Sequence, residues 1–224
     1  MTKQFWIVLL ALLSAGAPTA YSQPQKRTFN KVLADSLRRM TIVDQEAANI
    51  RQGKYKDYTL EAWDHFKDSV FKTHAQILEK FFDQHGYPGI DFVGKEGEHD
   101  FWLMVQHSDH NPAFQEKVLN AMQKEVQRNN ADKKNFAYLT DRLYLNTGRK
   151  QLYGTQVIYR RDICQAYPKP TDDSTHINDR RKAVGLPTVE EYLNLMTNMH
   201  FEMNKANMEE RGIKGPTLYT VPKQ

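Results

Sequence analysis

The first long segment of the chain carries apolar residues at helical spacing. These residues lie three, four or seven positions apart: Phe29, Leu33, Leu37, Met40 and Ala47. This period predicts an amphipathic helix over residues 28–51. Because successive helical residues advance by about 100°, Asp44 and Arg51 fall on the same core-facing side. A buried lone carboxylate is costly, so Asp44 is expected to need a partner from another helix.

A second apolar stripe follows a polar connector. Its members share one helical face: Trp63, Phe66, Val70, Ile77, Leu78 and Phe81. Thr59 is the expected cap of this helix and Gly86 its expected end. His74 lies at the centre of the stripe. It is either a core histidine satisfied by one hydrogen bond or part of a polar pocket shared with Asp44.

The rest of the chain predicts shorter elements. A loop containing Gly94 and Gly97 leads into a short buried helix over 98–106, or less favourably a strand. Asn111 and Pro112 begin a helix to about residue 129, and further helices are expected at 135–146, 175–184 and 188–212. Residues 151–167 switch to β-branched and aromatic residues, which favours a β-hairpin.

These elements predict a mainly α fold: a single-domain helical bundle with a small β-hairpin. The length of 224 residues suits one domain. The expected division is a signal peptide over 1–22, a helical domain over 23–212 and a flexible tail over 213–224.

The signal-peptide prediction rests on one basic residue, Lys3, an apolar run over 5–13, and small residues at Ala20 and Ser22. The run is shorter than the roughly 20 apolar residues that span a bilayer. Export to the periplasm or the extracellular space is therefore expected, with no stable membrane anchor.

Composition narrows the function classes. The formal charge of +4 comes from scattered basic pairs rather than one basic tract, which argues against a nucleic-acid partner for an exported protein. Cys164 is the only cysteine, so an intramolecular disulfide is impossible. No GxSxG motif or activated cysteine pattern points to covalent catalysis, and no cofactor is expected.

The segment QHSDHNPAFQ, residues 106–115, has three readings. His107 and His110 are helically spaced with His99, which would suit a metal, but HxxH alone lacks the third and fourth ligands of a zinc site, and no metal site is predicted. The segment otherwise either handles a proton or binds a ligand, or ends a helix ahead of Pro112.

Several motifs together resemble an uncharacterised bacterial family, domain of unknown function 6624. The matching stretches are VDQ at 43–45, HGYPG at 85–89, WLMVQHSDHNPAFQ at 102–115, YLTDR at 138–142, GRKQLYGTQ at 148–156 and DRRKAVGLPTVEEY at 179–192. The resemblance spans about residues 30–195. It implies no activity or cofactor, but it places many polar residues of these stretches in one recurring pattern.

A polar cleft built from that pattern is the working hypothesis. Asp44, His107 and Asp109 are the acid-base candidates. The candidate ligand-binding residues are Gln45, Gln106, Asp141, Arg142, Gln151, Tyr153, Gln156 and Arg180. Guanidinium and amide groups suit a small-molecule or peptide ligand that bears a carboxylate or an amide. The alternative is a non-enzymatic interaction module, and the oligomeric state is left open.

Overall fold

The computed structural model describes residues 27–222, and within this range the chain forms eight α-helices and one two-stranded antiparallel sheet. The predicted mainly α fold with a small hairpin is therefore confirmed. The predicted signal peptide lies outside the described residues. No helix within 27–222 is long and apolar enough to cross a membrane.

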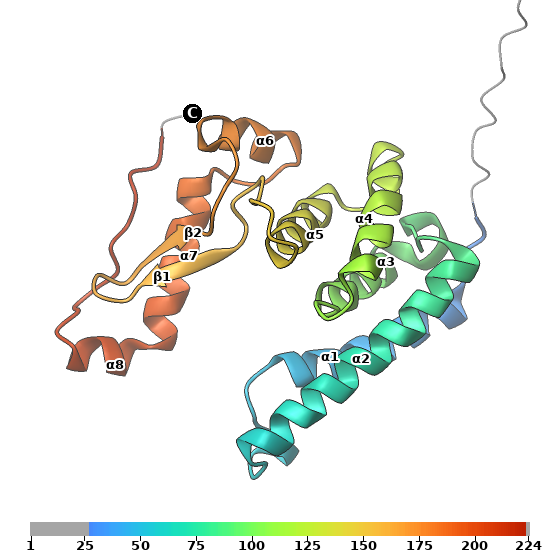
Figure 1. Cartoon of the computed structure of the whole chain (residues 1–224), viewed down its shortest axis with the longest axis horizontal. Helices are drawn as coiled ribbons and strands as arrows, with labels where there is room; N and C mark the ends of the chain where they lie inside the picture. Colours follow the sequence, from blue (N-terminus) through green and yellow to red (C-terminus); the bar gives the residue numbers. More distant parts are fainter. Residues whose placement is uncertain (1–26, 223–224) are drawn as a thin grey trace, which may run out of the picture.

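The first two helices lie side by side, and the second begins where the sequence predicts a cap (Figure 1). Helix α1 spans Lys31–Ala48 and α2 spans Leu60–His85. The Thr59 side chain accepts a hydrogen bond from the Ala62 amide, and Gly86 ends α2 with a φ of 69°. A 3₁₀ turn, Gly53–Tyr55, joins the two helices. Arg51 lies beyond the end of α1 and is exposed, so its predicted core-facing position is wrong.

The third helix is longer than the sequence predicts. Helix α3 spans Ile90–Gln106 and includes Gly97 and a break at Gly94, whose φ is 76°. The loop expected here is therefore a kinked helical segment, because Gly94 accommodates the left-handed backbone that most other residues avoid. Helices α4 (Pro112–Gln127) and α5 (Lys133–Asn146) follow, with Asn111 as the cap of α4 as predicted.

The hairpin is confirmed with shorter strands than predicted. Strands β1 (Val157–Arg160) and β2 (Gln165–Pro168) pair in antiparallel register, with Val157 opposite Pro168. The start of the predicted hairpin is instead an irregular loop in which Gln151 bridges to Thr171.

The last predicted helix, over 188–212, is two helices. A 3₁₀ turn, Ser174–His176, and α6 (Ile177–Ala183) lead to α7 (Val189–Met203), which starts at the predicted Thr188 capping box. The chain bends at Asn204 before α8 (Lys205–Glu210). In the predicted tail, Thr217 and Tyr219 donate backbone hydrogen bonds to the Cys164 carbonyl and the Asn194 side chain.

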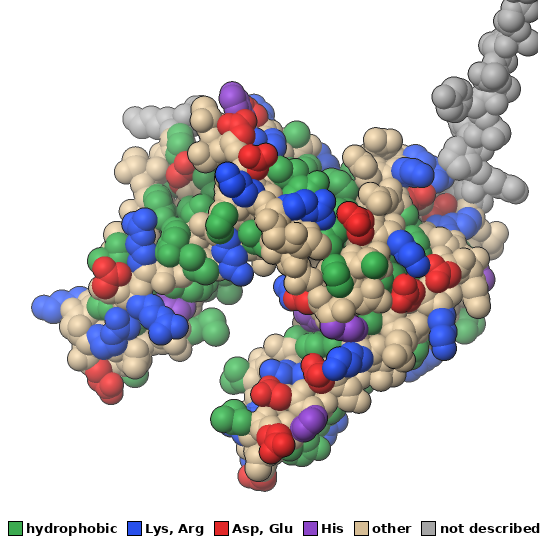
Figure 2. Space-filling view, viewed as in Figure 1, with side chains coloured by type: hydrophobic (Ala, Val, Ile, Leu, Met, Phe, Trp, Pro, Cys, Tyr) green, Lys and Arg blue, Asp and Glu red, His purple; other side chains and the backbone are tan. Residues whose placement is uncertain are grey.

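Within residues 27–222, two larger hydrophobic cores hold most of these elements, and a third, small cluster of Cys164, Phe201 and Met208 holds α8. The larger lies among α1–α5 and is centred on side chains such as Phe101, Phe114 and Leu139. The smaller joins the hairpin to α6 and α7 through Ala166, Ile177, Val189 and Leu193. Figure 1 shows α5 between these two halves. Figure 2 shows a deep hollow that separates the α7–α8 end from the α1–α2 end.

Candidate functional site

Asp44 is fully buried on the inward face of α1. Its Oδ2 lies 2.6 Å from His107 Nδ1, and Gln45 donates its side-chain amide to the same oxygen at 3.1 Å. Asp44 thus has a partner from another segment of the fold, as its inward position on the first helix predicts. The two residues come from different helices, so the partner that a buried carboxylate requires is supplied by the end of α3.

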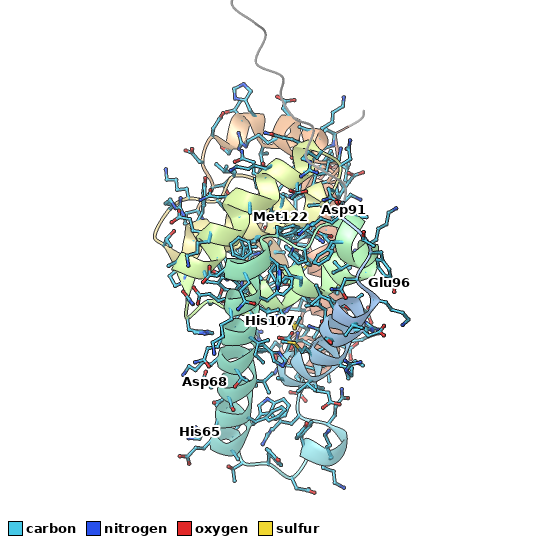
Figure 3. The ribbon with its side chains drawn as sticks, turned by 90° about the vertical axis from the view of Figure 1, so that its right-hand side faces the viewer. His65, Asp68, Asp91, Glu96, His107 and Met122 are labelled. Atoms are coloured by element: carbon cyan, nitrogen blue, oxygen red, sulfur yellow. The ribbon has the colours of Figure 1, made fainter. Side chains whose placement is uncertain are left out.

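His107 lies directly after α3 and forms its C-terminal cap. Its side chain is 17% exposed, and its ring packs at 4.8 Å from the ring of Phe71 on α2. Nε2 makes no hydrogen bond with residues 27–222 and is not sealed from solvent. Figure 3 shows His107 between α1 and α2. One ring nitrogen is therefore held by Asp44 while the other is open.

A second imidazole faces the same carboxylate. His74 Nδ1 lies 3.7 Å from Asp44 Oδ1, which is too long for a direct hydrogen bond. Within the described chain neither of these two buried atoms has a hydrogen-bond partner. His74 is thus part of a polar pocket shared with Asp44, the second of the two readings that its sequence position allowed.

The charge state of Asp44 follows from opposing effects. Burial alone raises the pKa of Asp44, but the hydrogen bond with His107, the nearby His74, the charge of His107 and the Gln45 amide together lower it below its ordinary value. Asp44 is therefore a carboxylate at neutral pH and only accepts hydrogen bonds. It follows that His107 Nδ1 carries the proton of the 2.6 Å contact.

Asp109 is engaged by an arginine. Arg142 donates Nε and Nη2 to the two carboxylate oxygens at 2.8 and 2.7 Å, a bidentate pair. Gln115 also donates to Asp109 at 3.2 Å, and Asn146 donates to its backbone carbonyl. This network anchors the turn after His107 to α4 and α5, and it leaves Asp109 poorly placed to accept a substrate proton.

A cavity of about 320 Å³ opens beside this ion pair. Its walls are Asp109, Arg142, Leu145, Asn146, Gln156 and Lys169. Three candidate residues, Asp109, Arg142 and Gln156, therefore meet at one concavity. Asp109, in the wall of this cavity, is two residues from His107 in the chain. The Cα atoms of the two residues therefore lie within about 7 Å of each other. The Asp44 and His107 side chains do not line this cavity.

Asp141 clamps the loop that precedes the hairpin. Its carboxylate accepts hydrogen bonds from the backbone amides of Leu152, Tyr153 and Thr155 and from the Thr155 hydroxyl, at 2.7 to 3.2 Å. Burial raises the pKa of Asp141, and these donors oppose that rise. The contacts support a structural role for this side chain.

Gln151 and Arg180 are likewise used by the protein backbone. Gln151 donates to the carbonyls of Gln156 and Lys169 and accepts from the Gln156 amide. Arg180 donates to the carbonyls of Leu152, Asp172 and Asp173. The structure does not bring either group to the Asp44–His107 pair.

The remaining candidates, Gln45, Gln106 and Tyr153, lie either next to the Asp44–His107 pair or in the loop held by Asp141. Gln45 contacts Asp44, and Gln106 immediately precedes His107, with no hydrogen bond from its side chain to residues 27–222. Tyr153 belongs to the Asp141-clamped loop, and burial raises the pKa of its hydroxyl. Gln156 does not join Asp44 and His107, since it lines the neighbouring cavity.

Sequence reasoning did not identify three buried polar side chains. Gln115 on α4 donates to the carbonyls of Val105 and Gln106 at the end of α3. Arg181 is fully buried and donates to the carbonyls of Tyr153 and Pro187. Glu98 is buried on α3. Gln115 carries no charge, and Arg181 lies beside other basic residues, Arg180 and Lys182. Neither residue therefore stands out in the sequence as an isolated charge on a core-facing side.

The described residues contain no group of three or more histidine, cysteine, aspartate or glutamate side chains placed to hold a metal ion. His99 packs against Trp102 with its ring tilted by 38° and lies 3.3 Å from the Asn135 side-chain amide. The site that the geometry offers is thus a carboxylate–imidazole pair next to a polar cavity.

A family model described as a family of unknown function, DUF6624, matches residues 32–203. No curated protein and no solved structure matches the chain. The matched range contains Asp44, His107, the Asp109–Arg142 pair and the Asp141 clamp. The chain therefore belongs to the DUF6624 family of unknown function.

Proposed function

We propose that this protein binds a small carboxylate- or amide-bearing ligand beside His107 and uses the Asp44–His107 pair to transfer a proton during its hydrolysis. The observation that carries the proposal is the 2.6 Å contact between Asp44 Oδ2 and His107 Nδ1. A buried carboxylate that fixes Nδ1–H leaves Nε2 as an open acceptor, which is the arrangement of an oriented general base.

The chemical step would use water as the nucleophile. His107 Nε2 would take a proton from water as the water oxygen bonds to the ligand carbonyl carbon. The same proton would then pass to the leaving amine as the carbon–nitrogen bond breaks. Asp44 would stay ionised and stabilise the transient imidazolium. Ser108, the adjacent hydroxyl, is buried and donates to the Met104 carbonyl, so it is a poor nucleophile.

The neighbouring cavity would hold the ligand's anionic end. Asp109 accepts from two donors of Arg142, Nε and Nη2, whereas Arg142 Nη1 makes no hydrogen bond with residues 27–222. Lys169 adds a second cation to the wall, and Gln156 adds an amide. The cavity wall thus carries two positive charges, from Arg142 and Lys169, and one negative charge, from Asp109. This net positive charge favours binding of an anionic group.

A panel of N-acylated amino acids and dipeptides, followed by NMR for binding and product release, tests this function. The wild type should bind or cleave a member of the panel, and Asp44→Asn and His107→Gln should abolish cleavage. Asp35→Asn, on the exposed side of α1, and His65→Gln, on the exposed side of α2, are matched controls. Equal turnover in Asp44→Asn and wild type would rule out the proposed role of the pair.

A second candidate function is a non-enzymatic interaction module, supported by one surface. Leu195, Met199 and Met203 follow one another at four-residue spacing on α7 and are exposed. The same side of α7 carries Tyr192, whose ring packs on Tyr138 of α5. The apolar row thus continues past the covered part of the helix. Light scattering of wild type and Met199→Glu should reveal an assembly only in the wild type if this row joins two copies.

A further inference from the structure

A second cavity lies at the opposite end of α3 from His107. It has a volume of about 330 Å³ and opens between the start of α3, the end of α4 and the start of α5. Its lining includes the charged Lys95, Glu98 and Lys133 and the apolar Ile90, Val126 and Ala131. Figure 3 shows Asp91 and Glu96, on this first part of α3, well away from His107. The volume suits a small ligand.

One of the residues that line this cavity is a buried glutamate, Glu98. Glu98 is only 2% exposed, and both of its hydrogen bonds fall on Oε1, from the Tyr87 hydroxyl and the Asp132 amide. Oε2 accepts no hydrogen bond from residues 27–222 and is not among the sealed polar atoms. One oxygen of a buried carboxyl therefore faces the cavity without a donor.

The rim of the cavity offers a cation. Lys95 lies three residues before Glu98 on the same helix, so the two side chains are neighbours, yet they form no ion pair. Lys95 makes no ion pair with any residue in 27–222, whereas Lys133 directs its ammonium to the Ala183 carbonyl. An open acceptor and an open cation thus flank one small space.

We propose that this cavity, the Glu98 cavity, binds a small zwitterion with an ammonium and a carboxylate on the same carbon atom, a free α-amino acid. The ammonium would donate to Glu98 Oε2 and the carboxylate would accept from Lys95. A simple cation would be repelled by Lys95 and a simple anion by Glu98. Ile90, Val126 and Ala131 supply apolar wall for a short aliphatic side chain.

The protonation of Glu98 adds a second, independent readout. Burial raises the pKa of Glu98 to about 7, with Asp132 adding to the rise and the Tyr87 and Asp132 hydrogen bonds opposing it. The ionisable groups around it are Tyr87, Asp132, Lys95, His99 and Lys133, together with Glu125, whose charge raises the pKa of Tyr87. An ammonium requires the ionised form, so binding at neutral pH should release a proton and affinity should rise with pH.

Calorimetric titration of the full chain with glycine, L-alanine and L-valine tests the proposal, in two buffers of different ionisation enthalpy. At least one of these amino acids should bind, with proton release near pH 7. Glu98→Gln, which keeps the Tyr87 contact, and Lys95→Met should each weaken binding at least tenfold. Methylamine and acetate should bind at least tenfold more weakly than the amino acid.

The controls separate this site from the Asp44–His107 pair. Glu96→Gln, on the exposed side of α3, should bind as the wild type does. Asp44→Asn should also keep full binding, and circular dichroism should confirm that Glu98→Gln is folded. The proposal is wrong if none of the three amino acids binds at millimolar concentration, if folded Glu98→Gln binds unchanged, or if Asp44→Asn abolishes binding.

Discussion

Asp44 Oδ2 and His107 Nδ1 lie 2.6 Å apart although 63 residues separate them in the chain. The contact joins the inward face of α1 to the end of α3, two helices that pack directly on one another. It gives Asp44 Oδ2 a partner from outside α1, in addition to the Gln45 amide of α1 itself, and it fixes which nitrogen of His107 is open. The same contact thus contributes to stability and defines the proposed reactive atom.

Replacing Asp44 separates these two contributions. Asp44→Asn keeps the shape of the side chain and an oxygen that accepts from His107, so the protein should fold with a loss of about 1 to 3 kcal/mol. Turnover of a panel substrate should disappear. Urea denaturation and the NMR assay measure the two effects. Asp35→Asn should change stability by less than about 1 kcal/mol, since its ion pair with Lys31 is exposed.

Acid should weaken the fold through Asp44. The folded state lowers the pKa of Asp44 below its ordinary value of 3.8, so the ionised form contributes stability above that pH. This contribution should be lost as pH falls below 3.8 toward the folded-state pKa. Denaturation midpoints over this range should fall more steeply for the wild type than for Asp44→Asn. Parallel slopes would mean that Asp44 does not titrate differently in the folded chain.

Glu98 should change the pH dependence of stability in the opposite direction to Asp44. Its pKa of about 7 in the folded protein exceeds the ordinary 4.5, so the folded state binds the extra proton between these values. Stability from this group is therefore complete below pH 4.5 and is lost as pH rises through about 7. The loss corresponds to about 3 kcal/mol at 1.36 kcal/mol per pKa unit. Glu98→Gln should remove this part of the pH dependence in urea denaturation, and an unchanged slope would contradict it.

Asp141 should stabilise the loop that precedes the hairpin. Asp141→Ala would leave the buried amide of Thr155 and the part-buried amides of Leu152 and Tyr153 without acceptors, at a cost of about 1 to 3 kcal/mol for each buried amide before relaxation. The loop before the hairpin should lose protection against amide hydrogen exchange. Asp172→Asn, an exposed change in the same half of the chain, should leave exchange unaltered. Normal protection in Asp141→Ala would refute the clamp.

Much of the fold follows from local signals. Several helix ends are set by contacts within a few residues of the chain, and the structure has them at the predicted positions: Thr59, Gly86, Asn111–Pro112 and the Thr188 capping box. The inward position of Asp44 follows from the helical period of its neighbours. Its need for a partner follows from the free energy of burying a charge.

The unpredicted features depend on distant backbone. Gly94 and Gly97 are typical of a loop, yet the segment is helical on both sides of Gly94. Gly97 packs beside Ala34 of α1, and a Cβ at position 97 would come within 2.8 Å of the Val93 side chain. Gln151 and Arg180 resemble ligand-binding groups, but their partners are main-chain carbonyls of other segments. Neither spacing nor residue type reveals a main-chain partner from another part of the fold.

The tautomer of His107 tests the central claim most directly. Long-range ¹H–¹⁵N NMR at about pH 8, above the ordinary histidine pKa, reports which ring nitrogen carries the proton. The wild type should show Nδ1 protonated and Nε2 free, and Asp44→Asn should shift toward the other tautomer because an amide can also donate. His65 should be unaffected in both. A proton on Nε2 of neutral His107, or the same tautomer balance in both proteins, would contradict the oriented general base.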